Sequence, residues 1–473
     1  MLSLAHLGIF LVAATWMLGG SPPWAKAILS QWGSLSALLT LVAVVRHWKS
    51  GRKHLRPLLW LWPFLLFNCL VLLSCRTPSY REIHFGSSVL LIQIPRPAWP
   101  PNTAVPAESL QGLWLFDAIY LSCFNLLLII RQRRTIRGLL LFAALNALVL
   151  SVFGTLQHFS DAKGPFFNMA PTRQNFFFAS FIYHNHWGAF ALLMTALSLG
   201  LMWHYAQRGG SRNFIRTPAF AGLVAVLFLA ATEPLSASRS CTGLIAFLLL
   251  GAFLQWLGRL VRQRRELHES IAVPVVGTCA AGTAAVAGIW YVAAADIASR
   301  AALTREQLVD THASGGISFE AVRLFLGSRF TVYYDTWRMA KDRIWFGWGM
   351  GSFIHVFLNY NTQGINPVDH LRTYYSEAHN DWLQSLAEHG LVGSALLGLC
   401  ALAPLLGCWR RELGRILPLY LLAGCGLILA YAWFEFPFGN TAVVLVWWLL
   451  FFAALQYSRL SSAVLSAEPP RQP

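Results

Sequence analysis

Residues 377–393 read EAHNDWLQSLAEHGLVG, and in this stretch ionisable and amide side chains run directly into a long apolar segment. Polar groups at the mouth of an apolar helix are costly in a membrane and are usually functional. The stretch therefore predicts a membrane-spanning helix that begins near residue 381. It also indicates where the chemistry of the chain is to be sought.

The rest of the chain repeats this apolar pattern. Of its 473 residues, 56% are hydrophobic and only 12% are charged, whereas a soluble domain carries roughly 25% charged residues. The apolar residues come in blocks of about 20, the length that crosses a bilayer as a helix. The composition predicts an all-α polytopic membrane protein. We expect twelve spans, near residues 3–19, 27–46, 57–75, 110–130, 138–156, 180–203, 218–234, 241–258, 271–294, 381–405, 416–434 and 440–457.

The net charge of +16 is explained by topology. Loops between the expected spans alternate sharply in charge, and the positive-inside rule makes the basic set cytoplasmic, together with both termini. The basicity therefore requires no nucleic-acid partner. The basic set comprises residues 46–56, 131–137, 208–216, 259–265 and 410–415, and the tail after residue 458.

Three longer segments fall on the other, extracytoplasmic side. Residues 76–109 are rich in proline, which predicts an irregular loop. In residues 295–380 apolar side chains recur at helical spacing, which predicts short amphipathic helices that lie against the membrane surface or cap the bundle. The third segment is 157–179. We expect four regions: N-terminal transmembrane helices (1–156), central transmembrane helices with an outer arginine turn (157–294), a large periplasmic loop (295–380), and C-terminal transmembrane helices with a short cytoplasmic tail (381–473).

Arginines are the first candidates for a site on that side, because a guanidinium binds pyrophosphate oxygens in pairs. Arg239 lies in a short turn at the mouth of the bundle. It could bind a ligand there, or it could only extend its charged end to the membrane surface without a role in function. Arg329 and Arg338 are nine residues apart and face different sides of a helix. At most one should line a site, while the other pairs with Asp335 or Asp342.

His379 is the candidate general base, because histidine exchanges protons near neutral pH. Glu377 and Asn380 lie beside it and are expected to contact the substrate. Asn380 or Asp381 as a helix N-cap would explain part of the motif without chemistry. Asn185 opens the sixth span, where it could bind a sugar or pack helices.

Two further motifs allow more than one interpretation. The glycines of residues 347–353 favour a tight turn with an aromatic anchor over a nucleotide loop. Glu435, in the last outer turn, could neutralise an arginine, orient the substrate, or be exposed. Neither the eight cysteines nor the histidines have a spacing that indicates a metal site.

These pieces appear in the order seen in the O-antigen ligase and polymerase-like family, which the chain resembles over about residues 170–450. The matching segments are 181–188, 238–240, the Arg329 segment with 347–353, and the His379 stretch. The resemblance implies a multi-span glycosyltransferase fold in the bacterial inner membrane. Its donor would be a glycan on undecaprenyl pyrophosphate, presented on the outer face, and it would use no metal or nucleotide cofactor.

The resemblance also implies roles for individual residues. His379 would be the base, while Arg239 and Arg329 would hold the pyrophosphate. A further family arginine corresponds loosely to Arg173. The acceptor would be a second lipid-linked glycan, a lipid A core or a protein, so ligase and polymerase stay open.

Two other classes of protein remain as alternatives. A lipid-linked glycan flippase would line its pathway with charged groups inside the spans. The expected spans hold few, with Asp117 and Glu388 as the main exceptions, which favours an enzyme. A non-catalytic component of a polysaccharide-assembly complex would tolerate the loss of His379.

Overall fold

The computed structural model describes residues 2–50, 52–85, 88–97, 99–170, 176–209, 216–289, 291, 294, 328–363, 374–408 and 413–465. Within these ranges, ten helices are long and apolar enough to cross a membrane. Two further apolar helices, Leu2–Trp16 and Ile416–Tyr431, are shorter. A helix overlaps each of the twelve expected spans, and the predicted all-α polytopic fold is confirmed.

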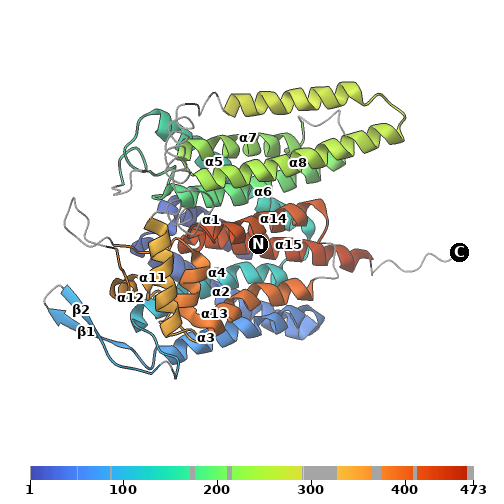
Figure 1. Ribbon diagram of the computed structural model, residues 1–473. Helices are drawn as coiled ribbons and strands as arrows, with labels where there is room; N and C mark the ends of the chain where they lie inside the picture. Colours follow the sequence, from blue (N-terminus) through green and yellow to red (C-terminus); the bar gives the residue numbers. More distant parts are fainter. Residues whose placement is uncertain are drawn as a thin grey trace.

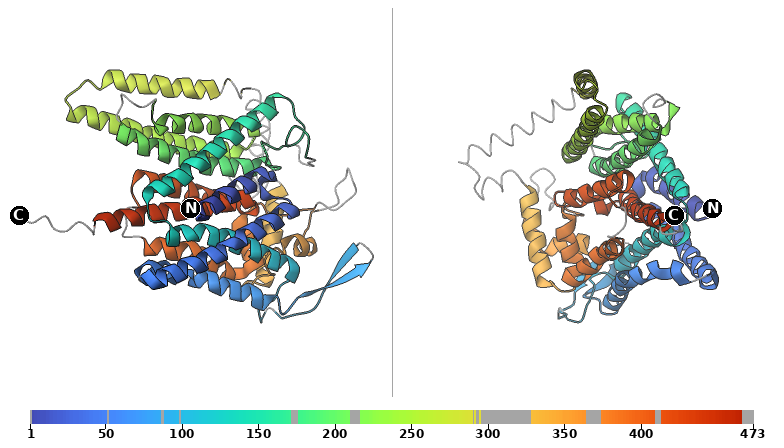
Figure 2. Two further views of the ribbon diagram at one scale, coloured as in Figure 1. Left: turned by 180° about the vertical axis from the view of Figure 1, so that it is seen from behind. Right: turned by 90° about the vertical axis from the view of Figure 1, so that its right-hand side faces the viewer.

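The long helices run side by side along one direction, with α6 and α15 near the middle (Figure 1). Helix α8 and the helix Ala272–Ile289 form one edge of the bundle (Figure 2). The elements are α1 (Leu2–Trp16), η1 (Leu18–Gly20), α2 (Pro23–Ser50), η2 (Arg52–Leu61), α3 (Trp62–Ser74), β1 (Tyr80–Phe85), β2 (Ser88–Gln93), α4 (Pro106–Ile129), α5 (Arg133–Phe159), α6 (His184–Gly209), α7 (Pro218–Ser236), α8 (Arg239–Glu266), α11 (Ser328–Asp342), α12 (Phe353–Val356), η4 (Phe357–Asn359), α13 (Asp381–Gly407), α14 (Ile416–Tyr431), η5 (Pro437–Gly439) and α15 (Thr441–Leu465).

Aromatic packing holds the centre of the bundle together. The ring of Tyr120 in α4 lies 4.8 Å from that of Trp448 and 5.4 Å from that of Phe452 in α15. Such edge-to-face pairs add specific geometry to the burial of large apolar surface. Helix α8 instead leaves Leu250 and Leu254 more than half exposed, which is the pattern of a helix that faces lipid.

The expectation of an irregular loop at residues 76–109 was wrong in part. Strands β1 and β2 form an antiparallel hairpin in which Tyr80 pairs with Gln93 and Ile83 with Leu90. The prolines flank the strands instead of interrupting them, so the ladder keeps its donors. Counting prolines over the whole segment hid this short β-rich run.

One end of the bundle carries the hairpin together with α11 and α12, and we call it the capped end (Figure 1). A second apolar core lies there. It joins Tyr80 and Val105 from the hairpin region to Trp348 and Phe353 from the loop before α13. Helix α11 turns Val332, Met339 and other apolar residues into this core while Tyr334 and Trp337 stay exposed. Of the two predicted placements, capping of the bundle is the one seen for residues 328–363, whereas residues 295–327 and 364–373 of that segment lie outside the described residues.

Helix α13 is broken at Gly390, where φ is 63° and ψ is −172°. The glycine loop 347–353 lies against this break and forms hydrogen bonds with the backbone carbonyls that the break leaves open. The N–H of Trp348 donates to the carbonyl of Ala387 at 2.9 Å, and that of Gly349 donates to the carbonyl of Glu388 at 2.8 Å. Because Gly349 has a positive φ and Trp348 is buried, the predicted tight turn with an aromatic anchor is confirmed.

Candidate functional site

The site is organised by the turn between α14 and α15, at the capped end. The N–H of Phe438 in this turn donates to the Asp381 carboxylate at 2.9 Å, and the N–H of Asp381 donates to the carbonyl of Ala432 at 2.9 Å. These bonds attach the turn to the first residue of α13. Glu435 lies within the turn, and only 3% of its side chain is exposed.

Four groups from three separate parts of the chain surround the Glu435 carboxylate. Its Oε1 accepts from Asn185 at 2.9 Å and from the guanidinium of Arg329. Its Oε2 accepts from Nδ1 of His379 at 3.1 Å and from the Tyr183 hydroxyl at 3.4 Å. A nearly buried carboxylate is stable only with such donors. We call these five residues the Glu435 cluster.

Charge neighbours decide the ionisation of Glu435. Burial alone would raise the pKa of its carboxyl, but the hydrogen bond with His379 and the positive charge of Arg329 hold that pKa below its ordinary value. Glu435 is therefore an anion at neutral pH. Of the interpretations left open from the sequence, neutralisation of an arginine is the one that the geometry supports.

His379 is held from both its backbone and its ring. Its φ is 53°, a conformation that non-glycine residues seldom adopt, and its carbonyl accepts from the Tyr333 hydroxyl at 2.8 Å. The ring stands edge-on to Phe436 with centroids 4.8 Å apart. Since Nδ1 lies against the carboxylate, the neutral ring carries its proton there and presents a lone pair at Nε2. About a quarter of the side chain, 24%, is exposed.

The two arginines of α11 face different sides of the helix and have different partners, as their spacing predicted. Arg329 pairs with Glu435 and also donates to the carbonyl of Phe434 at 3.0 Å. Arg338 pairs with Asp335 at 3.6 Å on another face of the helix. The Arg329 side chain is still 37% exposed, so part of its fork can reach a ligand.

Asn185 joins the cluster from the first turn of α6. Its amide also donates to the Tyr183 hydroxyl at 2.8 Å. Gly188, one turn further, permits a close approach to the start of α8, because a Cβ there would lie 2.8 Å from both the Cβ of Cys241 and Oγ of Ser238. The turn before Arg239 therefore packs against the end of the helix that carries Asn185.

The remaining candidates are placed as follows. Arg239 is exposed at the first residue of α8, and Arg173 lies outside the described residues. The side chain of Asn380 accepts from the N–H of Leu383 at 3.0 Å, as a helix N-cap does.

Glu377 does not contact the Glu435 cluster through its carboxylate in the bonds described, but accepts instead from Gln384 at 2.6 Å. Burial raises the pKa of Glu377 above its ordinary value, and the hydrogen bond from Gln384 opposes that rise.

Sequence reasoning missed two tyrosines that contact the site and one buried carboxyl elsewhere in the bundle. Tyr183 and Tyr333 were not singled out, although Tyr183 lies within the 181–188 segment. The list of charged groups in the spans was also incomplete, since Glu233 lies in α7 and is fully buried. The mean hydropathy of the α7 span is high, so it gave no sign of one carboxyl within it.

Comparison with known families matches residues 224–398 to the model of the O-antigen ligase family. No curated protein matches the chain. The matched region holds Arg239, Arg329 and His379, whereas Asn185 and Glu435 lie on either side of it. Residues 224–398 thus match the O-antigen ligase family, which supports a relation of this chain to O-antigen ligases and polymerases.

Proposed function

We propose that the protein is a membrane glycosyltransferase that transfers or polymerises a glycan carried on undecaprenyl pyrophosphate. The match of residues 224–398 to the O-antigen ligase family supports a membrane function in polysaccharide assembly. The observation that supports the finer proposal is the contact of one carboxylate, Glu435, with both a histidine and an arginine. A base and a cation are what this transfer needs from a protein.

In the proposed reaction, Nε2 of His379 takes the proton of the acceptor hydroxyl. The hydroxyl oxygen bonds to the anomeric carbon of the donor as the bond from that carbon to the pyrophosphate oxygen breaks. The electron pair leaves with the pyrophosphate, and the proton stays on the imidazole. Glu435 stabilises the imidazolium that forms, as the carboxylate of a catalytic triad does.

The leaving group requires positive charge that is already in place. Arg329 supplies it from the cluster, where its exposed face remains available beside the bond with Glu435. Arg239 would supply a second guanidinium at the N-terminus of α8, where the helix dipole also favours an anion. A single displacement inverts the anomeric configuration, so a product that retains it would contradict this mechanism.

We place the reaction on the outer face of the bacterial inner membrane. The Glu435 cluster lies at the capped end, and the described basic residues at 46–50, 131–137 and 259–265 lie at the other end of the bundle. By the positive-inside rule the capped end is extracytoplasmic. There the donor would meet a glycan, a lipid A core or a protein as acceptor.

The test is reconstitution of the purified protein with lipid-linked oligosaccharide, without added metal or nucleotide, beside His379→Ala. A matched control is His355→Ala, which removes a histidine of the capped end that faces Glu108 instead of Glu435. Wild type and the control should release undecaprenyl pyrophosphate, whereas His379→Ala should lose almost all turnover.

The acceptor requirement then separates the candidate functions. Longer lipid-linked chains formed from the donor alone would identify a polymerase, and turnover only with lipid A core or a protein would identify a ligase. Movement of the donor across the bilayer without any turnover would overturn the enzyme in favour of a flippase. Equal activity of His379→Ala and wild type would remove His379 from the mechanism.

A further inference from the structure

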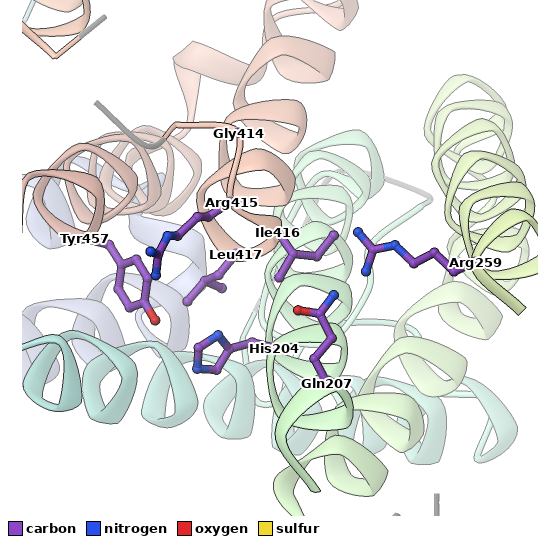
Figure 3. Close-up of a pocket in the computed structure, with 8 residues that line it drawn as sticks. All are labelled: His204, Gln207, Arg259, Gly414, Arg415, Ile416, Leu417 and Tyr457. Carbon is purple, nitrogen blue, oxygen red and sulfur yellow. The ribbon is translucent and has the colours of Figure 1, made fainter. Parts of the chain in front are cut away.

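The acceptor of the proposed reaction has to bind within reach of His379, at the capped end. A cavity of about 380 Å³ lies elsewhere, between α6, α8, α14 and α15 (Figure 3). Asn185 lies in the first turn of α6, whereas His204, which lines the cavity, lies near the end of that helix. At about 1.5 Å per residue, the cavity is on the order of 30 Å from the Glu435 cluster. It is therefore too far away to hold the acceptor.

Lys26 brings a cation to the capped end that the proposed reaction has not used. It lies in the first turn of α2, and its side chain is exposed. Residues of a helix are about 100° apart, so Lys26 projects between Leu29 and Ser30, which are only 0% and 3% exposed. Trp24 and Ile28 point the opposite way and are 52% and 48% exposed. Lys26 therefore lies on the face of α2 that is turned to the bundle, not on the face turned to lipid.

Two general rules disfavour a lysine at this position. The positive-inside rule places the excess of lysine and arginine on the cytoplasmic side. A cation near the N-terminus of a helix also meets the positive end of the helix dipole. The first turn of α2 holds no acidic residue that would offset this charge. Lys26 is thus more than an ordinary surface residue of an apolar helix.

The start of α2 is fixed to the turn that follows Glu435. Nδ2 of Asn440 donates to the Ser21 hydroxyl at 3.0 Å. The Thr441 hydroxyl donates to the carbonyl of Gly20 at 2.7 Å. These bonds hold the first turn of α2 against the segment that carries the Glu435 cluster.

Glu377 contacts the same turn. A Cβ added at Gly439 would lie 3.8 Å from the carboxyl carbon of Glu377. The charges of Lys26 and His379 both act on this carboxyl, and Lys26 also interacts electrostatically with His186. Lys26 and Glu377, both within the described ranges, form no ion pair with each other. Both therefore keep hydrogen-bonding capacity for a ligand beside His379.

Lys26 and Arg329 approach the site from opposite sides. Helix α2, in blue, and helix α11, in gold, lie on opposite sides of the bundle (Figure 2). In a single displacement, the attacking oxygen and the leaving pyrophosphate lie on opposite sides of the anomeric carbon. Since Arg329 is assigned to the pyrophosphate, the side of Lys26 and Glu377 is left for the acceptor.

We propose that Lys26 and Glu377 bind the acceptor sugar that carries the attacking hydroxyl. The acceptor is then a glycan, either lipid A core or a lipid-linked glycan, and not a protein. An ammonium supplies three donors and a carboxylate supplies acceptors, so the pair matches neighbouring sugar hydroxyls, each of which can donate and accept. This inference rests on the proposed function and extends it to Lys26, which lies outside the matched residues 224–398.

The test is steady-state transfer by the reconstituted protein from saturating donor. The titrated acceptor is lipid A core, or a single glycan unit on a shortened polyprenyl carrier. Lys26→Met removes the ammonium from an exposed side chain, and a hydrogen bond from a charged donor is lost. Its KM for the acceptor should rise about tenfold, equivalent to about 1.4 kcal/mol. Its kcat and its KM for the donor should stay close to wild type, since His379 and Arg329 are unchanged.

Lys26→Arg keeps the charge, so its KM for the acceptor should fall between those of wild type and Lys26→Met. The matched control is Lys163→Met, which removes the same charge from an exposed lysine of the outer segment after α5. The control should have the acceptor KM of wild type.

An unchanged acceptor KM in Lys26→Met, or an equal rise in Lys163→Met, would overturn the inference. A rise in the donor KM alone would also overturn it, because Lys26 would then act on the donor. Turnover only with a protein acceptor would overturn it as well, because that acceptor carries no sugar. No turnover by wild type with any acceptor would instead overturn the proposed function, and this inference with it.

Discussion

Replacing Glu435 with glutamine should trap His379 in the wrong tautomer. The amide of the variant has one oxygen and one NH₂ group where the carboxylate has two acceptors. If the NH₂ took the Oε1 position, it would face two donors, Arg329 and Asn185. The favoured rotamer therefore keeps oxygen at that position and points the NH₂ group at His379 Nδ1, which lies 3.1 Å from Oε2 in the wild type.

A donor at that position forces Nδ1 to accept, so the imidazole proton moves to Nε2 and the base can no longer take the acceptor proton. General base catalysis contributes about 10²–10⁴ in rate, and the equivalent change in a catalytic triad lowers kcat about 10⁴-fold. We expect kcat to fall by about 10²–10⁴, or about 2.7–5.4 kcal/mol. The loss of folding stability should be smaller than the roughly 3–5 kcal/mol of a broken buried pair, because the Arg329 side chain is 37% exposed.

The assay is steady-state release of undecaprenyl pyrophosphate from the reconstituted protein, with kcat and KM determined separately. Glu233→Gln is the matched control, since it makes the same change from carboxyl to amide at a buried position in α7 that makes none of the bonds of the cluster described above. That variant should keep the wild-type kcat. Wild-type kcat in Glu435→Gln, at full folded yield, would refute the role assigned to this carboxylate.

Three further substitutions test other parts of the structure. Asn185→Ala removes a 2.9 Å donor to Glu435 and should lower kcat by at most about ten- to hundredfold, since a hydrogen bond to a charged group contributes about 1.5–3 kcal/mol; an unchanged kcat would contradict this. Because the pKa of Glu377 is raised, its contribution to stability is present below the ordinary glutamate pKa and is lost as the pH rises through the raised value. As the pH is raised from about 4 to about 7, the melting temperature of Glu377→Gln should therefore increase relative to that of wild type. A constant difference between the two melting temperatures would contradict the raised pKa. Gly390→Ala should lower the melting temperature strongly, because a Cβ would lie 2.4 Å from the backbone N of Phe346 at a φ of +63°, whereas Gly398→Ala has open space and should not.

Hydropathy predicted the positions of the helices because lipid leaves a chain few other choices. Every backbone N–H and C=O in the hydrocarbon layer has to be paired within the protein, so each apolar block becomes a helix. The hairpin of β1 and β2 lies outside that layer, and there local side-chain packing against Trp348 decides the structure. Proline content was a poor guide in that region because the prolines sit at the ends of the strands.

The site was predictable as a set of residue types but not as a set of contacts. His379, Arg329 and Asn185 were all candidates, yet their common partner Glu435 had three open interpretations. Arg329 is 106 positions from Glu435, and Asn185 is 250 positions from it. No periodicity connects residues so far apart, because the packing of α6, α11 and the turn before α15 brings them together.

The break in α13 links the glycine loop to His379. The carboxylate of Glu388, just before the break, accepts from the N–H of Gly351 at 2.9 Å and from that of Phe353 at 3.1 Å. One turn earlier, Oε1 of Gln384 accepts from the N–H of Ala378 at 2.9 Å.

The loop thus fixes the first two turns of α13, and those turns fix the backbone next to His379. A continuous helix would satisfy its own carbonyls at Ala387 and Glu388 and would leave the loop amides without these partners. The left-handed backbone of His379 is therefore held from a loop about thirty residues earlier in the chain, which accounts for the appearance of the glycine motif and the histidine motif together in this sequence.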